Sequence, residues 1–110
     1  MVLEVYRITK SFPAEEKFGL VSQFRRAASA VPTNIVEGHR RKSKKEYLYF
    51  LNVADGSLEE TKYHFILARD LDYVTDLEFE KICEMTDEIG RMLSGLRKSL
   101  LNSFSLSLTP

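Results

Sequence analysis

The chain has 110 residues, which is enough for one domain and too few for two. Hydrophobic residues make up 44% of it, so a packed core is expected and a disordered chain is excluded. The formal net charge is zero, and no apolar run approaches the roughly 20 residues that a membrane-spanning helix needs.

The charges are unevenly divided along the chain. Residues 1–50 contain ten Lys or Arg and five Asp or Glu, whereas residues 51–110 contain six and eleven. Either the folded protein mixes these charges on its faces, or a basic surface meets an anionic partner or another copy of the chain. The single cysteine, Cys83, has no internal disulfide partner, which favours a reducing cytoplasm and a small apolar role for this residue.

Two helices are predicted in the N-terminal half. The first covers about residues 2–10 and ends at Ser11-Phe12-Pro13. The second covers about residues 14–41, with a kink at Pro32, because Pro32 removes one backbone donor while the apolar stepping stays in phase across it. Two helices broken at Pro32 are the alternative. The inward face of this segment is Phe24, Ala28, Val31 and Ile35.

The third predicted helix begins at a capping box, Ser43 with Glu46, and ends near Leu71. Its apolar residues alternate steps of four and three, which is the seam of an antiparallel bundle. They are Tyr47, Leu51, Ala54, Leu58, Thr61, Phe65 and Ala68. Gly56 inside this helix suggests a close helix crossing, and Asp72 is expected in the left-handed position that follows the helix.

The fourth predicted helix starts at a second capping box, Thr75 with Glu78, and ends near Leu101. Its inward residues are Ile82, Met85, Ile89, Met92, Leu93, Leu96 and Leu100. Residues 102–110 show no helical period and are expected to form a mobile tail. The fold class is therefore all-α, a left-handed antiparallel up-down four-helix bundle over residues 1–101 with a short first helix. That short helix leaves apolar surface for another chain, or for residues upstream, to cover.

A second stripe on the second helix carries polar residues. It consists of Gln23, Ala27, Ala30, Asn34, Glu37 and Arg41. In one interpretation, Glu37 pairs with Arg41 and Asn34 binds a nearby carbonyl. In the other, Gln23, Asn34 and Glu37 belong to a polar surface at a subunit contact or ligand groove.

One dense basic set is present, and it lies on the second helix and the following linker. Its candidate phosphate contacts are Arg25, Arg26, Arg40, Arg41, Lys42, Lys44 and Lys45. These residues are either a solvated helix end or a binding surface for RNA or DNA. Tyr47 and Tyr49 follow closely and could stack on bases, although Tyr47 fits the core better. Tyr6, Phe12 and Phe18 are interpreted as core residues.

No catalytic or metal-binding pattern is visible. Glu37 and His39 are two residues apart and Glu60 and His64 are four apart, whereas di-iron bundles use Glu-x-x-His pairs. Both histidines are expected near the surface. No phosphate-binding glycine loop or nucleophile elbow occurs, so the sequence predicts a non-enzymatic protein without a cofactor or metal.

Several elements in register resemble a known family. They are Phe12-Pro13, Glu16 to Gly19, Gln23-x-Arg25-Arg26-Ala27, Pro32-x-Asn34-Ile35-x-Glu37-Gly38, Arg41, Ser43, Glu46, Gly56-Ser57 and Glu59. The chain resembles the small bacterial four-helix-bundle proteins encoded in intervening sequences of 23S ribosomal RNA genes, closely over about residues 5–74 and by pattern in the fourth helix. The accessory protein of diversity-generating retroelements is similar. Family members usually begin earlier, so the first helix looks truncated, and Asp72 stands where they tend to have glycine.

The resemblance implies a four-helix bundle assembled as a homo-oligomer, commonly a pentamer, with no established catalytic activity. It also implies nucleic-acid binding and, in the retroelement branch, association with a reverse transcriptase and its RNA. The expected function is therefore a cytoplasmic accessory protein that binds RNA or DNA through its basic helix. The alternative is a protein–protein scaffold ring that does not touch nucleic acid.

Overall fold

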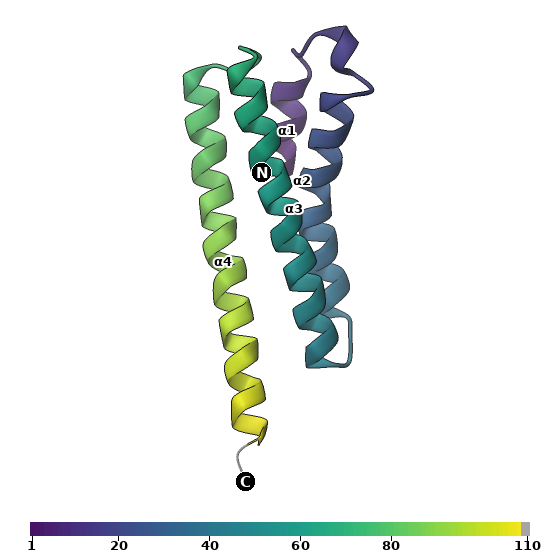
Figure 1. The fold of residues 1–110 in the computed structure, drawn as a ribbon, viewed down its shortest axis with the longest axis vertical. Coiled ribbons are helices and arrows are strands. Elements are labelled where there is room, and N and C mark those ends of the chain that lie inside the picture. The colour runs from purple at the N-terminus through teal and green to yellow at the C-terminus, as the bar shows by residue number, and fades with distance from the viewer. Residues whose placement is uncertain (109–110) are drawn as a thin grey trace.

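A computed structural model describes residues 1–108, which form an all-helical bundle of about 59 × 24 × 18 Å. The elements are α1 (Val2–Thr9), a 3-10 helix η1 (Ala14–Glu16), α2 (Leu20–His39), α3 (Lys44–Asp70) and α4 (Asp76–Leu108) (Figure 1). No strand occurs among the described residues, so the predicted all-α class and the packing of four helices as a bundle are confirmed. The antiparallel up-down topology and the handedness of the bundle stay predictions. None of the described helices is both long and apolar enough to cross a membrane.

The second helix begins later than predicted. Residues 14–16 form the single 3-10 turn η1 after Pro13, and the Gly19 amide donates to the carbonyl of Glu16 at 3.1 Å. Gly19 is not helical (φ −104°, ψ −106°), and α2 starts after it at Leu20. From there α2 continues through Pro32 to His39, so the alternative of two helices broken at Pro32 is wrong. The bend angle at Pro32 stays a prediction.

The fourth helix ends later than predicted. It continues past Leu101 to Leu108, and the last two residues of the predicted tail lie outside the described residues. Residues 102–108 contain neither glycine nor proline, so each further residue adds a backbone hydrogen bond even where the apolar period is lost. The mobility of the predicted tail stays a prediction.

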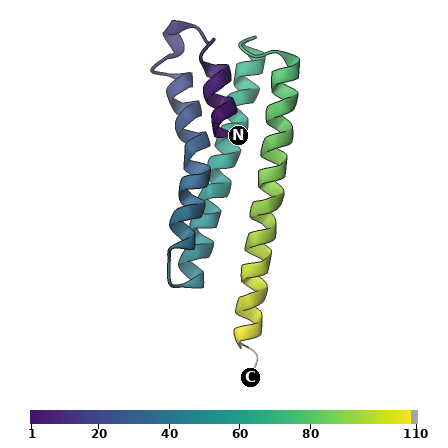
Figure 2. The same cartoon turned by 180° about the vertical axis from the view of Figure 1, so that it is seen from behind.

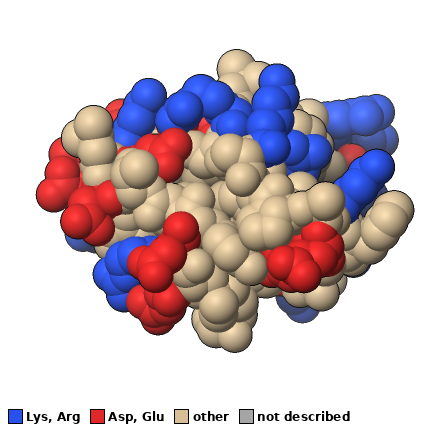
Figure 3. Space-filling view, turned by 90° about the horizontal axis from the view of Figure 1, so that it is seen from above, with Lys and Arg blue, Asp and Glu red and all other residues tan. Residues whose placement is uncertain are grey.

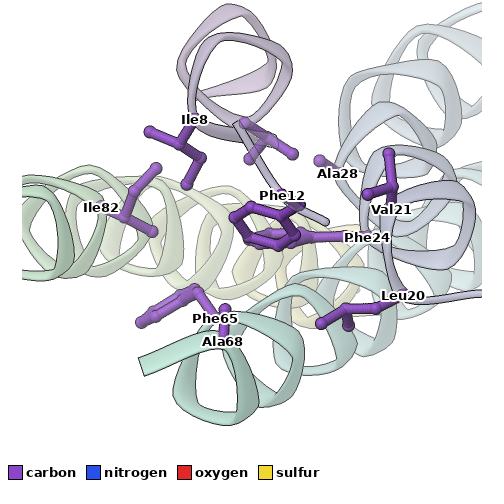
Figure 4. Packing of buried hydrophobic residues seen from close by; sticks show 10 residues of the cluster. Ile8, Phe12, Leu20, Val21, Phe24, Ala28, Phe65, Ala68 and Ile82 are labelled. Carbon is purple, nitrogen blue, oxygen red and sulfur yellow. The ribbon is translucent and has the colours of Figure 1, made fainter. Parts of the chain in front are cut away.

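The core consists of two clusters. The first lies where all four helices meet, and in it Phe12 packs against Phe24 and Tyr73 with ring centroids 6.4 and 5.2 Å apart. Figure 4 shows side chains from α1, α2, α3 and α4 turned toward this centre. The second cluster lies further along the bundle and is made of Val31, Leu51, Ala54, Leu58 and Leu93. The predicted inward faces of α2 and α3 are confirmed, although Ile35 and Tyr47 are only half-buried.

The inward face predicted for α4 is partly wrong. Ile82 and Leu93 are buried, but Met92 and Leu96 are 60% and 39% exposed. The reason is the length of α1, which covers the space between α2 and α4 only at one end of the bundle (Figure 2). Past the start of α1, an open apolar groove of about 230 Å³ remains, lined by Met1, Val2, Val31, Pro32, Ile35, Ile89 and Met92.

The starts of α3 and α4 and the end of α3 rest on local signals that the sequence shows. Thr75 and Glu78 form a complete capping box, with reciprocal bonds of 2.9 and 3.1 Å between side chain and amide. At Ser43 only one half forms, a bond of 3.3 Å from the Glu46 amide to the Ser43 hydroxyl. Asp72 adopts the expected left-handed conformation, with φ at 61°.

The close crossing expected at Gly56 lies elsewhere. A Cβ on Gly56 would meet no atom within 4 Å, so the explanation given for this glycine is wrong. A Cβ on Gly38 would lie 2.7 Å from the Phe50 Cβ and 3.0 Å from a ring carbon of Tyr47. The contact that requires glycine is therefore the one where α2 ends against the start of α3.

Candidate nucleic-acid interface

The predicted basic residues form two groups along α2. Arg25 and Arg26 lie in its first half, whereas Arg40 to Lys42 lie at its end and in the turn to α3, and Lys44 and Lys45 begin α3. Arg26, Thr33 and Arg40 are spaced by seven residues, so they share one side of the helix, with about 21 Å between Arg26 and Arg40. Viewed from one end of the bundle, most of the visible Lys and Arg atoms lie along one edge, and the visible Asp and Glu form separate clusters (Figure 3).

The group at the turn is only partly free to bind a phosphate. Arg41 is paired with Glu37 at 2.5 Å and its guanidinium lies 4.8 Å from the centre of the Phe50 ring. Lys44 donates a hydrogen bond to the Ser103 hydroxyl. Arg40, Lys42 and Lys45 are exposed at the surface. These three side chains are the stronger candidates in this group.

Arg25 connects α2 to α1. Its Nε donates to the Thr9 hydroxyl at 2.8 Å, and its guanidinium lies 4.5 Å from the centre of the Tyr6 ring. A second bond of 3.4 Å reaches the Tyr6 carbonyl. Because these contacts hold α1 in place, a loss of binding in an Arg25 variant would not separate phosphate contact from folding.

An open groove of about 610 Å³ runs along the outer side of α2, beginning at α1 and the α1–α2 connection. Tyr6 and Phe18 lie at that end, and they are 41% and 89% exposed. The cations of the groove are Lys17, Arg25 and Arg26. Hydroxyl and amide groups continue it along the helix, from Ser22, Ser29, Thr33 and Asn34. Among the described residues, no Asp or Glu lines this groove.

The sequence interpretation missed this groove. Phe12 is buried as expected, but the assignment of Phe18 and Tyr6 to the core is wrong. Phe18 precedes Gly19 in the turn before α2, so the helical period that points Leu20 and Val21 inward does not apply to it. The available signal was the pair Pro13 and Gly19, because these two residue types mark local breaks in structure and enclose only five residues here.

The polar stripe of α2 makes the local contacts named in the first of its two interpretations, and its place at a subunit contact or ligand groove stays a prediction. Glu37 pairs with Arg41, and the Asn34 amide donates to the Ala30 carbonyl at 2.7 Å. Ala27 is buried against the neighbouring helix, and Gln23 is exposed beside Arg26 and Glu60 in a smaller groove of about 230 Å³. Within this chain, Asn34, Glu37 and Arg41 therefore find local partners, and Gln23 faces solvent.

The two histidines differ. His39 is exposed as expected, but His64 is only 4% exposed, so its predicted surface position is wrong. α3 packs against α2 on one flank and α4 on the other, and His64 lies on the α2 side, 6.0 Å from the Phe24 ring. Its Nε2 is 3.4 Å from Glu60 Oε1, and its buried Nδ1 has no hydrogen-bond partner among the described atoms.

No group of three or more His, Cys, Asp or Glu gathers as a metal-binding cluster within the part of the chain that the structure describes. Cys83 is half-buried against the first core cluster. Burial raises the pKa of the Cys83 thiol, so little thiolate forms at neutral pH and the residue is a poor nucleophile.

Comparison with known proteins identifies relatives by sequence and by fold. The profile of the 23S rRNA-intervening sequence protein family matches residues 1–95. A crystal structure of a protein of unknown function from the S23 ribosomal protein family of Bacteroides thetaiotaomicron is similar in fold. The two structures superpose with a TM-score of 0.78 over 88% of each chain, and their sequences are 24% identical. No curated protein matches this chain.

Proposed function

Because this chain belongs to the 23S rRNA-intervening sequence protein family, we propose that it is a non-enzymatic, oligomeric accessory protein that binds RNA or DNA. The observation that carries the proposal is the set of exposed cations formed by Arg26 on α2, Arg40 and Lys42 at the end of α2 and in the following turn, and Lys45 at the start of α3. Sequence-independent contacts of this kind supply most of the affinity for a phosphate backbone. The proposed location is the cytoplasm, where the free Cys83 would stay reduced.

Binding is tested by titrating a labelled structured RNA and a DNA duplex at several salt concentrations. We expect affinity to fall as salt rises, because each phosphate contact releases counterions. The double variant Arg40→Glu with Lys42→Glu should weaken binding several-fold. The matched control is Arg91→Glu with Lys98→Glu, which makes the same charge change at exposed positions of α4. No binding at low salt, or equal losses in both variants, would contradict the proposal.

Self-association is the second part of the proposal. The apolar groove beside Met92 and the exposed side chains of Val36 and Leu96 leave apolar surface on α2 and α4 that no other part of the described chain covers. A second copy would remove this surface from water, and the family resemblance suggests a pentamer. Light scattering of the wild type and of Met92→Asp measures the assembly state. The wild type should be an oligomer, and the variant should be a monomer. A monomeric wild type at micromolar concentration would refute the proposed self-association.

The same apolar surface favours a second candidate function, a scaffold ring that binds other proteins and never binds nucleic acid. In the retroelement branch that partner would be a reverse transcriptase. The titration separates the two functions, because a scaffold would assemble normally and show no salt-dependent binding of either nucleic acid.

A further inference from the structure

The groove along the outer side of α2 has features that a plain basic surface lacks. Phe18 is 89% exposed in the connection before α2, and the Lys17 ammonium lies 5.5 Å from the centre of its ring. At the same end, the Tyr6 ring carries the Arg25 guanidinium on its face at 4.5 Å. Aromatic faces and cations therefore alternate over a short distance.

This combination fits unpaired nucleotides better than an apolar protein surface. An apolar partner that covered Phe18 would also have to desolvate Lys17 and Arg26, and no acidic residue of the described chain lines the groove to pair with them. A nucleotide strand can cover Phe18 and also pair the cations, because its bases stack on the rings and its phosphates neutralise the cations. A duplex keeps its bases stacked on one another and cannot offer them to Phe18.

The rest of the groove supplies a path for the backbone of such a strand. From Val21 to Asn34 the helix rises about 20 Å, which accommodates several nucleotides. Thr33 donates its hydroxyl hydrogen to the Ser29 carbonyl at 2.8 Å. Within the described residues, the Ser22 and Ser29 hydroxyls make no hydrogen bond of their own and can donate to phosphate oxygens. Arg26 lies in this path, and Arg40 continues it seven residues beyond Thr33.

We propose that this groove binds single-stranded nucleic acid, with a base stacked on Phe18 and the backbone running along α2 toward Arg40. The inference rests on the proposed nucleic-acid binding and adds the substrate class and the stacking residue. RNA and DNA strands share the required chemistry. The serine and threonine hydroxyls of the groove can bond the 2′-hydroxyl groups, which only RNA carries.

The test uses fluorescence anisotropy with unstructured 12-nucleotide RNA and DNA strands and a 12-base-pair duplex, at one low salt concentration. The wild type should bind the strands more tightly than the duplex. Phe18→Ala should weaken strand binding at least about five-fold and leave duplex binding unchanged, and Phe18→Trp should restore it. Circular dichroism checks the fold of each variant. A preference for the RNA strand over the DNA strand would assign a role to the hydroxyl groups, and equal binding would assign recognition to stacking alone.

Two other exposed aromatic residues serve as controls. Tyr63 is 60% exposed on α3, and Tyr63→Ala should leave the affinity for the strands and for the duplex unchanged. Tyr49 is 62% exposed near the α2–α3 turn, and a loss that occurs in Tyr49→Ala and not in Phe18→Ala would overturn the assignment to this groove.

The outcomes separate this inference from the proposed function. Salt-dependent binding with no preference for single strands and no effect of Phe18→Ala would refute the inference and leave the proposed function standing. Absence of binding to every nucleic acid would refute both. Poly-glutamate could also displace the labelled strand as well as an unlabelled strand does, while Phe18→Ala binds the strand with unchanged affinity. This result would indicate an acidic protein ligand and would also overturn the inference.

Discussion

Gly38 lies at a helix contact that leaves no room for a side chain. The Phe50 Cβ would be 2.7 Å from an added Cβ, and because that atom is fixed to the backbone it cannot rotate away. Alanine is normally the better helix former by about 1 kcal/mol, so the two effects oppose each other at this position. The steric clash destabilises the fold more than the helix propensity of alanine stabilises it, because a contact this short requires α2 and α3 to move apart.

We therefore expect Gly38→Ala to lower the free energy of unfolding by about 1–3 kcal/mol. Gly56→Ala is the matched control, because Gly56 is an exposed helical glycine with open space around it. It should raise the free energy of unfolding by up to about 1 kcal/mol. Urea unfolding measures both, and a stabilising Gly38→Ala would show that the contact is looser than described.

Single residues also show where reasoning from sequence stops. The left-handed Asp72 and the buried Phe24 and Ala28 follow from local rules and from spacing, and they were predictable. His64 and Phe18 were not. His64 is buried because α3 has neighbours on two flanks, and Phe18 is exposed because a 3-10 turn replaces the start of the predicted helix.

At the scale of elements, α1 has eight residues and depends on its contacts with longer helices. Arg25 holds it to α2 through Thr9, and Glu4 holds it to α4. The Glu4 carboxylate accepts hydrogen bonds from Arg7 and lies 3.4 Å from Lys81 Nζ, while Arg7 also lies 3.5 Å from Glu78. These charged groups fix the position of α1 relative to α4.

The Glu4 contacts make the stability depend on pH. The hydrogen bond from Arg7, supported by Lys81, holds the pKa of Glu4 below its ordinary value of 4.5, although partial burial opposes this. Because the folded-state pKa is the lower one, the stabilisation is present above the unfolded-state pKa and is lost as pH falls through the folded-state pKa. We expect Glu4→Gln to lower the free energy of unfolding by about 1 kcal/mol at pH 7.

The difference between Glu4→Gln and the wild type should shrink as pH falls below about 4.5, because the wild-type carboxylate then takes up a proton. Unfolding in urea at pH 7, 5, 4 and 3 measures this trend. Glu84→Gln, at an exposed position of α4, should not change the stability at any of these pH values. A constant difference from pH 7 to pH 3 would show that the charge of Glu4 is not what stabilises the contact.

Element boundaries were predictable where a cap or a turn residue fixes them. The starts of α3 and α4 follow their capping boxes, whereas the start of α2 and the end of α4 were misplaced by several residues. The start of α2 was placed directly after Pro13, although Gly19 interrupts the segment, and the end of α4 was placed where the apolar period is lost. A proline–glycine interval can interrupt a periodic segment, and a helix can continue after its apolar period has ended.

Across the folded molecule, the excess of cations in the N-terminal half of the sequence is concentrated on one part of the surface. The cations of residues 1–50 lie mainly on the outer side of α2 and in the turn that follows it, away from the core. The sequence indicated this basic set and offered the Glu37–Arg41 pair as one interpretation. It could not show that Arg25 is held by Thr9 of α1, because that contact depends on how α1 packs on α2.

In the proposed complex, a nucleotide strand lies along α2 and contacts Arg26 and Arg40. The most direct test is the salt dependence of strand binding in the wild type, Arg26→Gln, Arg40→Gln and the control Arg91→Gln. If each arginine contacts one phosphate, Arg26→Gln and Arg40→Gln should each make the slope of log K against log salt shallower by roughly 0.7. Arg91→Gln should leave the slope unchanged. Identical slopes in all four proteins would contradict this arrangement.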